Sequence, residues 1–166
     1  NTGYHSASTN TGVYSAATNT GYHSASTNTG EHSASTNTGD CSVATNTGDC
    51  SASTNMGEYS VATNTGVYSV ATNTGYHSAS TNTGDYSVAT NTGYYSSAKV
   101  EGKGSIAMVT GRHSNAAGEL GCWLVLCERD DEYNIKNVKA VQVDGETIKP
   151  NVFYKLVNGE VIECNK

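Results

Sequence analysis

The first 98 residues of this 166-residue chain lack most of the side chains that build ordinary protein cores. They contain no Leu, Ile, Phe, Trp or Pro, so a conventional hydrophobic core is excluded in this region. They also contain no Lys or Arg, and their only charges are five acids, Glu31, Asp40, Asp49, Glu58 and Asp85, which give a formal net charge of −5. An acidic surface without bases argues against nucleic acid and anionic membranes as partners. The chain also lacks an apolar run long enough for membrane insertion.

What this region does contain is a strict repeat. Eleven copies of the nine-residue unit Asn-Thr-Gly-x-x-Ser-x-(Ala/Ser)-Thr fill residues 1–99, with substitutions only at Met56 and Lys99 among the other constant sites. A short fixed period of this kind is typical of a stacked solenoid. We expect the Gly at position three to turn with positive φ, which a β-carbon resists, and the Asn at position one to lie beside it in the corner. Thr-Asn-Thr-Gly is then the corner, and x-x-Ser-x-(Ala/Ser) is the strand.

The side-chain pattern predicts which positions face the interior. Alternate residues of a strand point the same way, so the small residues at positions six and eight should face inward and the bulky fifth position outward. Tyr occupies position four only in odd-numbered units, which indicates two unlike faces and an 18-residue coil. The sequence therefore predicts an all-β fold, a parallel β-solenoid with two nine-residue units per coil. Stacked backbone hydrogen bonds and ladders of Asn, Ser and Thr would hold it together.

The composition changes sharply at Lys99. All nine Lys and Arg residues, every Leu and Ile, and the only Trp, Phe and Pro lie from this residue onward. Asp144-Gly145 and Asn158-Gly159 are strong hairpin signals between alternating strands, which predicts a small β cap that shields the last coil. We expect three segments: a nonapeptide-repeat solenoid at 1–99, a transitional coil at 100–121 and an antiparallel β cap at 122–166.

Two stretches carry resemblances to known families. Residues 104–118, Gly-Ser-Ile-Ala-Met-Val-Thr-Gly-Arg-His-Ser-Asn-Ala-Ala-Gly, resemble the head repeats of trimeric autotransporter adhesins, whose pattern is Ser-x-Ala-Ile-Gly-x-x-Ser-x-Ala-x-Gly and whose fold is a β-roll. The Asn-Thr-Gly units together with residues 121–132 and 138–150 look like uncharacterised phage and prophage proteins of gut bacteria. The first resemblance implies an adhesive β-roll and a trimer, and the second brings no known active site.

The metal-binding patterns that a nine-residue period suggests are incomplete here. Calcium-binding nonapeptide rolls of secreted toxins use Gly-Gly-x-Gly-x-Asp, whereas each unit here has one Gly and no recurring Asp. Two units per coil would place His23 beside Cys41 and His32 beside Cys50. Two ligands do not make a transition-metal site, so we expect no metal and no cofactor.

Catalytic patterns are also missing. A Ser that is identical in eleven units cannot be one activated nucleophile, and the acidic run at residues 130–132 suits a solvated turn better than a pair of catalytic carboxylates. We therefore predict that the chain is not an enzyme.

The five cysteines are odd in number and form no disulfide framework. We expect reduced thiols and a cytoplasmic or virion-associated setting, although the sequence does not fix the location. The chain begins at Asn1 without an initiating Met, so we expect a fragment or a processed product.

The leading hypothesis is a structural and adhesive rod, of phage origin, that displays a Tyr, His and acid surface. Long regular faces suit self-association as a homo-oligomer or binding to a host glycan or protein. The contact residues that this hypothesis singles out are Tyr4, His5, Tyr22, His23, Tyr59, Tyr76, His77, Tyr94 and Tyr95.

Two alternatives come from other classes. The recurring Thr-x-Thr resembles the ice face of insect antifreeze solenoids, although a corner at this segment would not be flat. Its first members are Thr9, Thr11, Thr18, Thr20, Thr27 and Thr29. The other alternative is a phage-encoded inhibitor that mimics nucleic acid through its acidic charge, for which five acids are few.

Overall fold

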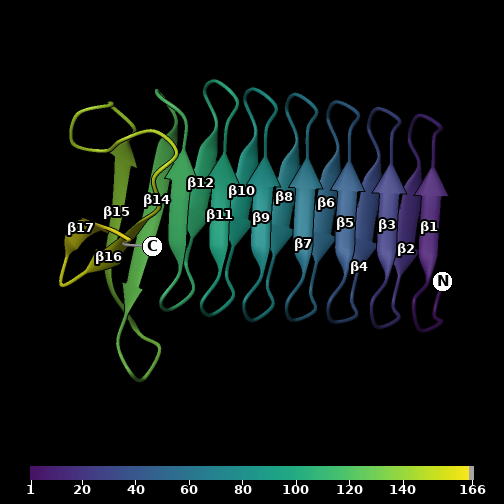
Figure 1. Ribbon diagram of the computed structural model, residues 1–166, viewed down its shortest axis with the longest axis horizontal. Coiled ribbons are helices and arrows are strands. Elements are labelled where there is room, and N and C mark those ends of the chain that lie inside the picture. Colours follow the sequence, from purple (N-terminus) through teal and green to yellow (C-terminus); the bar gives the residue numbers. More distant parts are fainter. Residues whose placement is uncertain (165–166) are drawn as a thin grey trace.

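The computed structural model describes residues 1–164, and all regular structure in this range is β (Figure 1). The strands form two sheets, A and B. Sheet A has nine strands in the order β1 (Ala7–Asn10), β3 (Ala25–Asn28), β5 (Val43–Asn46), β7 (Val61–Asn64), β9 (Ala79–Asn82), β11 (Ser97–Val100), β13 (Asn115–Gly118), β16 (Tyr154–Val157) and β17 (Glu160–Glu163). Sheet B has eight strands in the order β15 (Ile135–Gln142), β14 (Trp123–Arg129), β12 (Ile106–Val109), β10 (Val88–Asn91), β8 (Val70–Asn73), β6 (Ala52–Asn55), β4 (Ala34–Asn37) and β2 (Ala16–Asn19).

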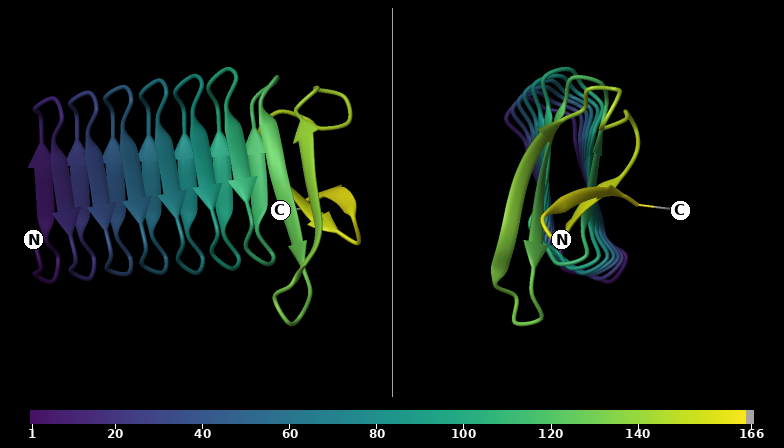
Figure 2. Two further views of the ribbon diagram at one scale, coloured as in Figure 1. Left: turned by 180° about the vertical axis from the view of Figure 1, so that it is seen from behind. Right: turned by 90° about the vertical axis from the view of Figure 1, so that its left-hand side faces the viewer.

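The repeats stack as a solenoid of 18-residue coils, which confirms the prediction of two units per coil. Ala7 of β1 pairs in parallel with Ala25 of β3, and the same register continues along both sheets. Odd-numbered units supply sheet A and even-numbered units supply sheet B. Seen along the rod, the two sheets lie face to face and successive coils are slightly rotated (Figure 2).

The predicted position of the strand within the unit was wrong by three residues. Each repeat strand covers positions seven, eight and nine and the Asn of the next unit, and the turn is Gly-x-x. The left-handed residue of this turn is at position five, as at His5 with φ 58° and Cys50 with φ 55°. The Asn therefore lies in a strand, and the corner that we expected at Thr-Asn-Thr-Gly does not exist.

The predicted reason for the repeated Gly was also wrong. The Gly residues at position three do not have positive φ. They are needed because consecutive coils approach closely: a β-carbon on Gly48 would lie 2.2 Å from the carbonyl oxygen of Gly30, one coil earlier. No substituent fits at that distance from backbone atoms.

The interior of the repeats is a polar network, as the small inward residues predicted. Ser24 and Ser42 at position six are buried, and so is each position-one Asn from Asn19 to Asn91. Asn46 donates its amide to the hydroxyl of Ser53 at 3.0 Å and to a backbone carbonyl, and it accepts from the hydroxyl of Ser35 at 2.9 Å. Most inward groups are paired in this way across or along the rod, which removes most of their desolvation cost.

The C-terminal end has a different core. β14 is a further strand of sheet B: it pairs in parallel with β12 on one side and antiparallel with β15 on the other. β16 joins sheet A beside β13, and β17 completes the cap. Leu124, Leu126, Val143, Tyr154 and Leu156 form the buried apolar cluster between these strands.

The five cysteines are all free thiols, and three of them, Cys122, Cys127 and Cys164, belong to the cap end. Burial raises the pKa of the Cys122 thiol. Within residues 1–164 the structure has no helix of the length and hydrophobicity that a membrane crossing needs.

Candidate contact surfaces

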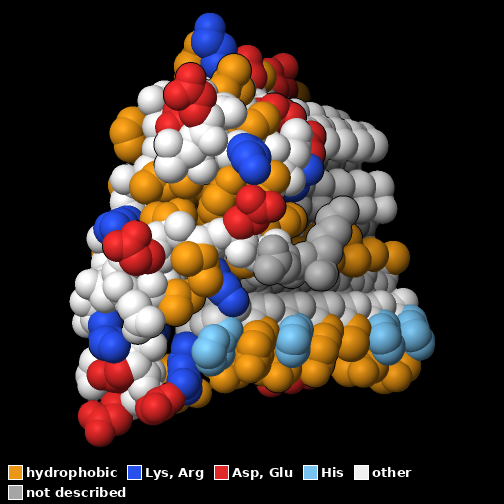
Figure 3. All heavy atoms as spheres, turned by 60° about the vertical axis from the view of Figure 1, so that its left-hand side comes forward, with side chains coloured by type: hydrophobic (Ala, Val, Ile, Leu, Met, Phe, Trp, Pro, Cys, Tyr) orange, Lys and Arg blue, Asp and Glu red, His pale blue; other side chains and the backbone are white. Residues whose placement is uncertain are grey.

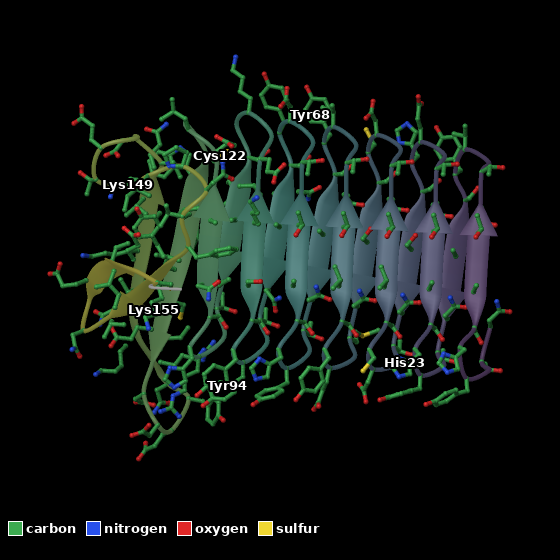
Figure 4. The ribbon with its side chains drawn as sticks, in the orientation of Figure 1. His23, Tyr68, Tyr94, Cys122, Lys149 and Lys155 are labelled. Carbon is green, nitrogen blue, oxygen red and sulfur yellow. The ribbon has the colours of Figure 1, made fainter. Side chains whose placement is uncertain are left out.

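The turns of the odd-numbered units line up along one edge of the rod, which we call the odd edge. It consists of positions four and five of those units, from residues 4–5 to 94–95, and the turn at 112–113 continues it. His23 and Tyr94 lie on this edge, and Tyr68 lies on the opposite, even edge (Figure 4). In the space-filling view the His side chains form a row with apolar side chains between them (Figure 3). All nine contact residues predicted from the sequence lie on the odd edge.

The rings of the odd edge stack on one another. At position five, the rings of His5 and His23 are stacked and nearly parallel. Their centroids are 5.1 Å apart, and the angle between their planes is 7°. After a break at Cys41, a second stack begins. Its successive centroid distances are 5.6 Å for Tyr59–His77, 5.2 Å for His77–Tyr95 and 5.0 Å for Tyr95–His113.

Position four carries a second, shorter column on the same edge. Tyr4 stacks on Tyr22 at 5.2 Å, and Tyr76 stacks on Tyr94 at 5.7 Å. Because the ring faces are covered by neighbouring rings, the edge presents ring rims, phenol hydroxyls and imidazole nitrogens to solvent. The result is a preordered strip of amphipathic groups.

Acids at position four have a structural use that the sequence analysis missed. The carboxylate of Asp40 accepts a hydrogen bond from the backbone N–H of Glu58 in the next coil, at 2.8 Å. Asp49 does the same for Val67 at 2.8 Å, and Asp85 for Lys103 at 2.7 Å. These carboxylates therefore tie coils together, and we do not carry the nucleic-acid-mimic hypothesis further.

The potential metal ligands that the sequence placed side by side occur only as two separate pairs, His23 with Cys41 and His32 with Cys50. Cys41 follows His23 in the position-five column, and its sulfur lies 3.6 Å from the Tyr22 hydroxyl oxygen; the hydrogen bond between the two groups raises the pKa of that phenol. On the even edge His32 stacks on Tyr14 at 5.0 Å, one rung from Cys50. In the part of the chain that the structure describes, no three His, Cys, Asp or Glu side chains are grouped to hold a metal ion.

In the repeats, the outer faces of the two sheets carry uncharged residues, mainly Ala, Val and Thr. In β5 the side chains alternate, with Val43 exposed, Ala44 buried, Thr45 partly exposed and Asn46 buried. The exposed Thr at position two continues the ladder beyond each strand, and the backbone N–H of Thr29 bonds the Asn10 carbonyl at 3.0 Å.

Each Thr-x-Thr pair thus lies along an extended segment, and the corner expected there is wrong. The six Thr residues predicted as an ice face divide between two surfaces. Thr9, Thr11, Thr27 and Thr29 belong to sheet A, and Thr18 and Thr20 belong to sheet B.

The turn at residues 111–114 was not among the predicted sites. It joins the odd edge to a small cavity beside the cap, which Arg112, His113, Arg129 and Lys155 line. A signal for it was available in the sequence, because Gly-Arg-His-Ser at 111–114 matches Gly-x-x-Ser of the repeat and so places His113 at position five.

Comparisons of the chain with protein-family models, with curated proteins and with solved structures found no match. The strand register itself establishes the solenoid, and proposals about function depend on the surfaces described above.

Proposed function

We propose that this chain is a rigid structural rod that makes adhesive contacts through its odd edge. The observation that carries the proposal is the strip of stacked Tyr and His side chains along one edge of the rod, in two runs separated at Cys41. Tyr is enriched at protein interfaces, and exposed apolar strips of this length mark interaction surfaces. In this proposal the chain is not an enzyme, needs no cofactor and belongs to a phage-derived particle.

The strip suits binding because its side chains are already ordered. Tyr4 is 67% exposed, yet its ring is held between Tyr22 and His5. A partner that contacts such rings loses little additional side-chain entropy on binding. The partner in this proposal is either a second copy of the chain, in a homo-oligomer, or a host glycan or protein.

The test replaces the position-four tyrosines by Val, which occurs naturally at this position in Val13 and Val67. The odd-edge variant carries Tyr→Val at residues 4, 22, 76 and 94. The control changes three even-edge tyrosines at position five, residues 14, 68 and 86, to His. Light scattering after size exclusion measures self-association, and an array of immobilised glycans measures host-type binding.

We expect the unmodified chain to associate or to bind the array, and the odd-edge variant alone to lose that property. An unmodified chain that is monomeric and binds no glycan contradicts both tested forms of the proposal. Equal loss in the odd-edge variant and the even-edge control would assign the effect to general surface change.

A second candidate, ice binding, is favoured by one specific observation. The Thr-x-Thr pairs lie along extended segments on the sheet faces rather than at corners, and they repeat at the strand spacing of about 4.8 Å. A regular, uncharged array of hydroxyl and methyl groups is the kind of surface that can match an ordered water layer.

Thermal hysteresis and ice recrystallisation assays test this candidate directly. Thr45→Lys with Thr63→Lys places charge on sheet A, and Thr54→Lys with Thr72→Lys places the same charge on sheet B. Loss of activity in one pair alone would identify the ice face, and absence of hysteresis in the unmodified chain would reject the candidate.

A further inference from the structure

A cavity of about 140 Å³ lies where the last turn of the odd edge meets the cap. Its wall includes Arg112 and His113 from the turn, Glu128 and Arg129 from β14, and Lys155 from β16. Three of the nine Lys and Arg residues of the chain therefore surround one small space, in a protein whose net charge is −6.

The only acid in this wall does not neutralise the bases. One carboxylate oxygen of Glu128 accepts the backbone N–H of Asn158 at 2.8 Å. The other accepts the backbone N–H of Gly159 at 2.9 Å and the side-chain amide of Asn137 at 2.8 Å. The Asn137 amide, followed by these backbone groups, lowers the pKa of Glu128, so the carboxylate is ionised but already engaged with the cap.

The bases themselves are incompletely paired. Arg112 forms an ion pair with the exposed Asp131. Arg129 donates to two neutral backbone carbonyls, those of Thr110 at 2.6 Å and Tyr133 at 2.6 Å. Among the described residues, no carboxylate forms an ion pair with Arg129 or Lys155.

We propose that this cavity binds a single oxyanion group, a carboxylate, sulfate or phosphate. Partly buried cations without counter-charges favour an anion, and guanidinium and ammonium groups form strong charge-assisted hydrogen bonds with such oxygens. The volume is well below that of sites for drug-sized ligands, which start near 300 Å³, so the cavity takes one charged group rather than a whole large ligand. The site is independent of contacts along the odd edge, although His113 belongs to both.

The probes are sodium acetate, sodium sulfate, sodium phosphate and a monosaccharide uronate, each titrated at low ionic strength into the isotopically labelled chain. Amide chemical shifts of residues 111–114, 127–129 and 155–157 report binding at the cavity. A free inorganic ion as the natural ligand predicts the tightest binding for sulfate or phosphate. An acidic sugar predicts that the uronate binds more tightly than acetate.

Two variants and one matched control locate the site. Lys155→Gln removes one cation from the wall of the cavity. Arg129→Lys keeps the positive charge but removes the planar guanidinium group and its several N–H donors. We expect each variant to weaken binding about tenfold, because each loses a hydrogen bond to a charged group. Lys103→Gln changes the net charge equally but lies on the even edge, and we expect it to leave binding unchanged.

The proposal is overturned if none of the four anions shifts the amides around the cavity. It is also overturned if Lys103→Gln weakens binding as much as Lys155→Gln does, because binding would then follow net charge. Unchanged affinity in both cavity variants, with their native amide spectra retained, would equally exclude this site.

Discussion

The repeats and the C-terminal end of the molecule share the same sheets but are stabilised by opposite chemistry. Between sheets A and B the repeats bury Asn, Ser and Ala, whereas the last coils bury Leu124, Leu126, Val143 and Leu156. The backbone ladders are continuous across the change, since β12 pairs in parallel with the polar repeat strand β10 and with the apolar strand β14.

This comparison shows that the coil geometry does not depend on the kind of core. The repeats require close approach of consecutive coils, which only Gly and small side chains allow, and hydrogen-bond partners for most of the side chains that they bury. What the cap requires is apolar volume. Apolar packing tolerates exchange of similar shapes, but a buried polar network loses stability when one partner is removed.

The largest loss of stability should come from a substitution that prevents the close approach of consecutive coils in the repeats. Gly48→Ala puts a β-carbon 2.2 Å from the Gly30 carbonyl oxygen, so two coils must separate. We expect a loss of about 4 kcal/mol or more in the free energy of unfolding, the range of severe backbone and packing disruptions. Chemical denaturation monitored by circular dichroism measures it.

The matched control is Gly121→Ala. Gly121 has φ 85°, but a β-carbon there meets nothing within 4 Å. It should therefore cost only about 1–2 kcal/mol, the penalty for a left-handed non-glycine residue. If Gly48→Ala proves the milder change, close approach of coils is not what the repeat Gly provides.

The second prediction exchanges residues within each core. Asn46→Leu removes one hydrogen-bond partner from each of Ser35 and Ser53 and the side-chain donor to a backbone carbonyl, and it should cost about 3 kcal/mol because several buried polar groups lose a bond at once. Leu124→Met conserves apolar volume and should cost less than about 1.5 kcal/mol. Thermal and denaturant unfolding measure both. Equal losses would mean that the repeat interior tolerates exchange as an apolar core does.

The sequence was sufficient to predict the architecture, because its period and its Tyr distribution reflect the register directly. Tyr occurs at position four only in odd-numbered units, which indicated 18-residue coils. The small Ser at position six indicated the inward face. The apolar cluster at the C-terminal end lies where the sequence has its Leu and Ile residues. Each of these features depends on the alternation of side chains, which is visible in a sequence.

The position of the turn was predicted wrongly because Gly was assumed to mark positive φ. In this fold the left-handed residue is the bulky one at position five, where its side chain gains ring stacking at an exposed tip. The sequence contained a corrective signal, since Gly104 occupies position five in the coil that follows the repeats, with φ 68°. The residues that line the cavity could not be grouped from the sequence. Arg129 and Lys155 come together only because β14 and β16 lie beside each other in the fold.

Acid should weaken the cap before it weakens the repeats. Backbone N–H groups of Ile148, Glu146 and Thr147 lower the pKa of Asp144, each donating at 2.9 Å. A carboxyl group whose folded pKa is depressed contributes stability above its ordinary pKa, near 4, and loses that contribution as pH falls through the lower folded value.

We therefore expect amide hydrogen exchange in residues 122–164 to accelerate relative to residues 19–91 as pH falls below about 4, after correction for intrinsic rates. Asp144→Asn should reduce this difference, whereas Glu146→Gln in the same loop should preserve it. Uniform acceleration along the whole rod would show that these carboxylates do not distinguish the cap.

The smallest predicted effect is a gain in stability. It depends on buried side-chain oxygens of the repeats that have no hydrogen-bond partner. Four buried Asn side-chain oxygens in the described chain accept no hydrogen bond, and each lies eleven residues after an Ala at position eight. These oxygens belong to Asn28, Asn55, Asn73 and Asn82.

Ser53, which is also at position eight, fills this gap for its own coil, because its hydroxyl donates to the Asn64 oxygen at 2.8 Å. Ala62→Ser should supply the same bond to Asn73 and raise the free energy of unfolding by about 1 kcal/mol, the net value of a typical hydrogen bond. Ala89→Ser is the control, because Val100 lies eleven residues later and Ala89 belongs to the apolar cluster, so this Ser should bring no gain. Paired denaturation curves measure the difference. A gain from Ala89→Ser as large as that from Ala62→Ser would show that the unpaired Asn oxygen does not limit stability in the repeats.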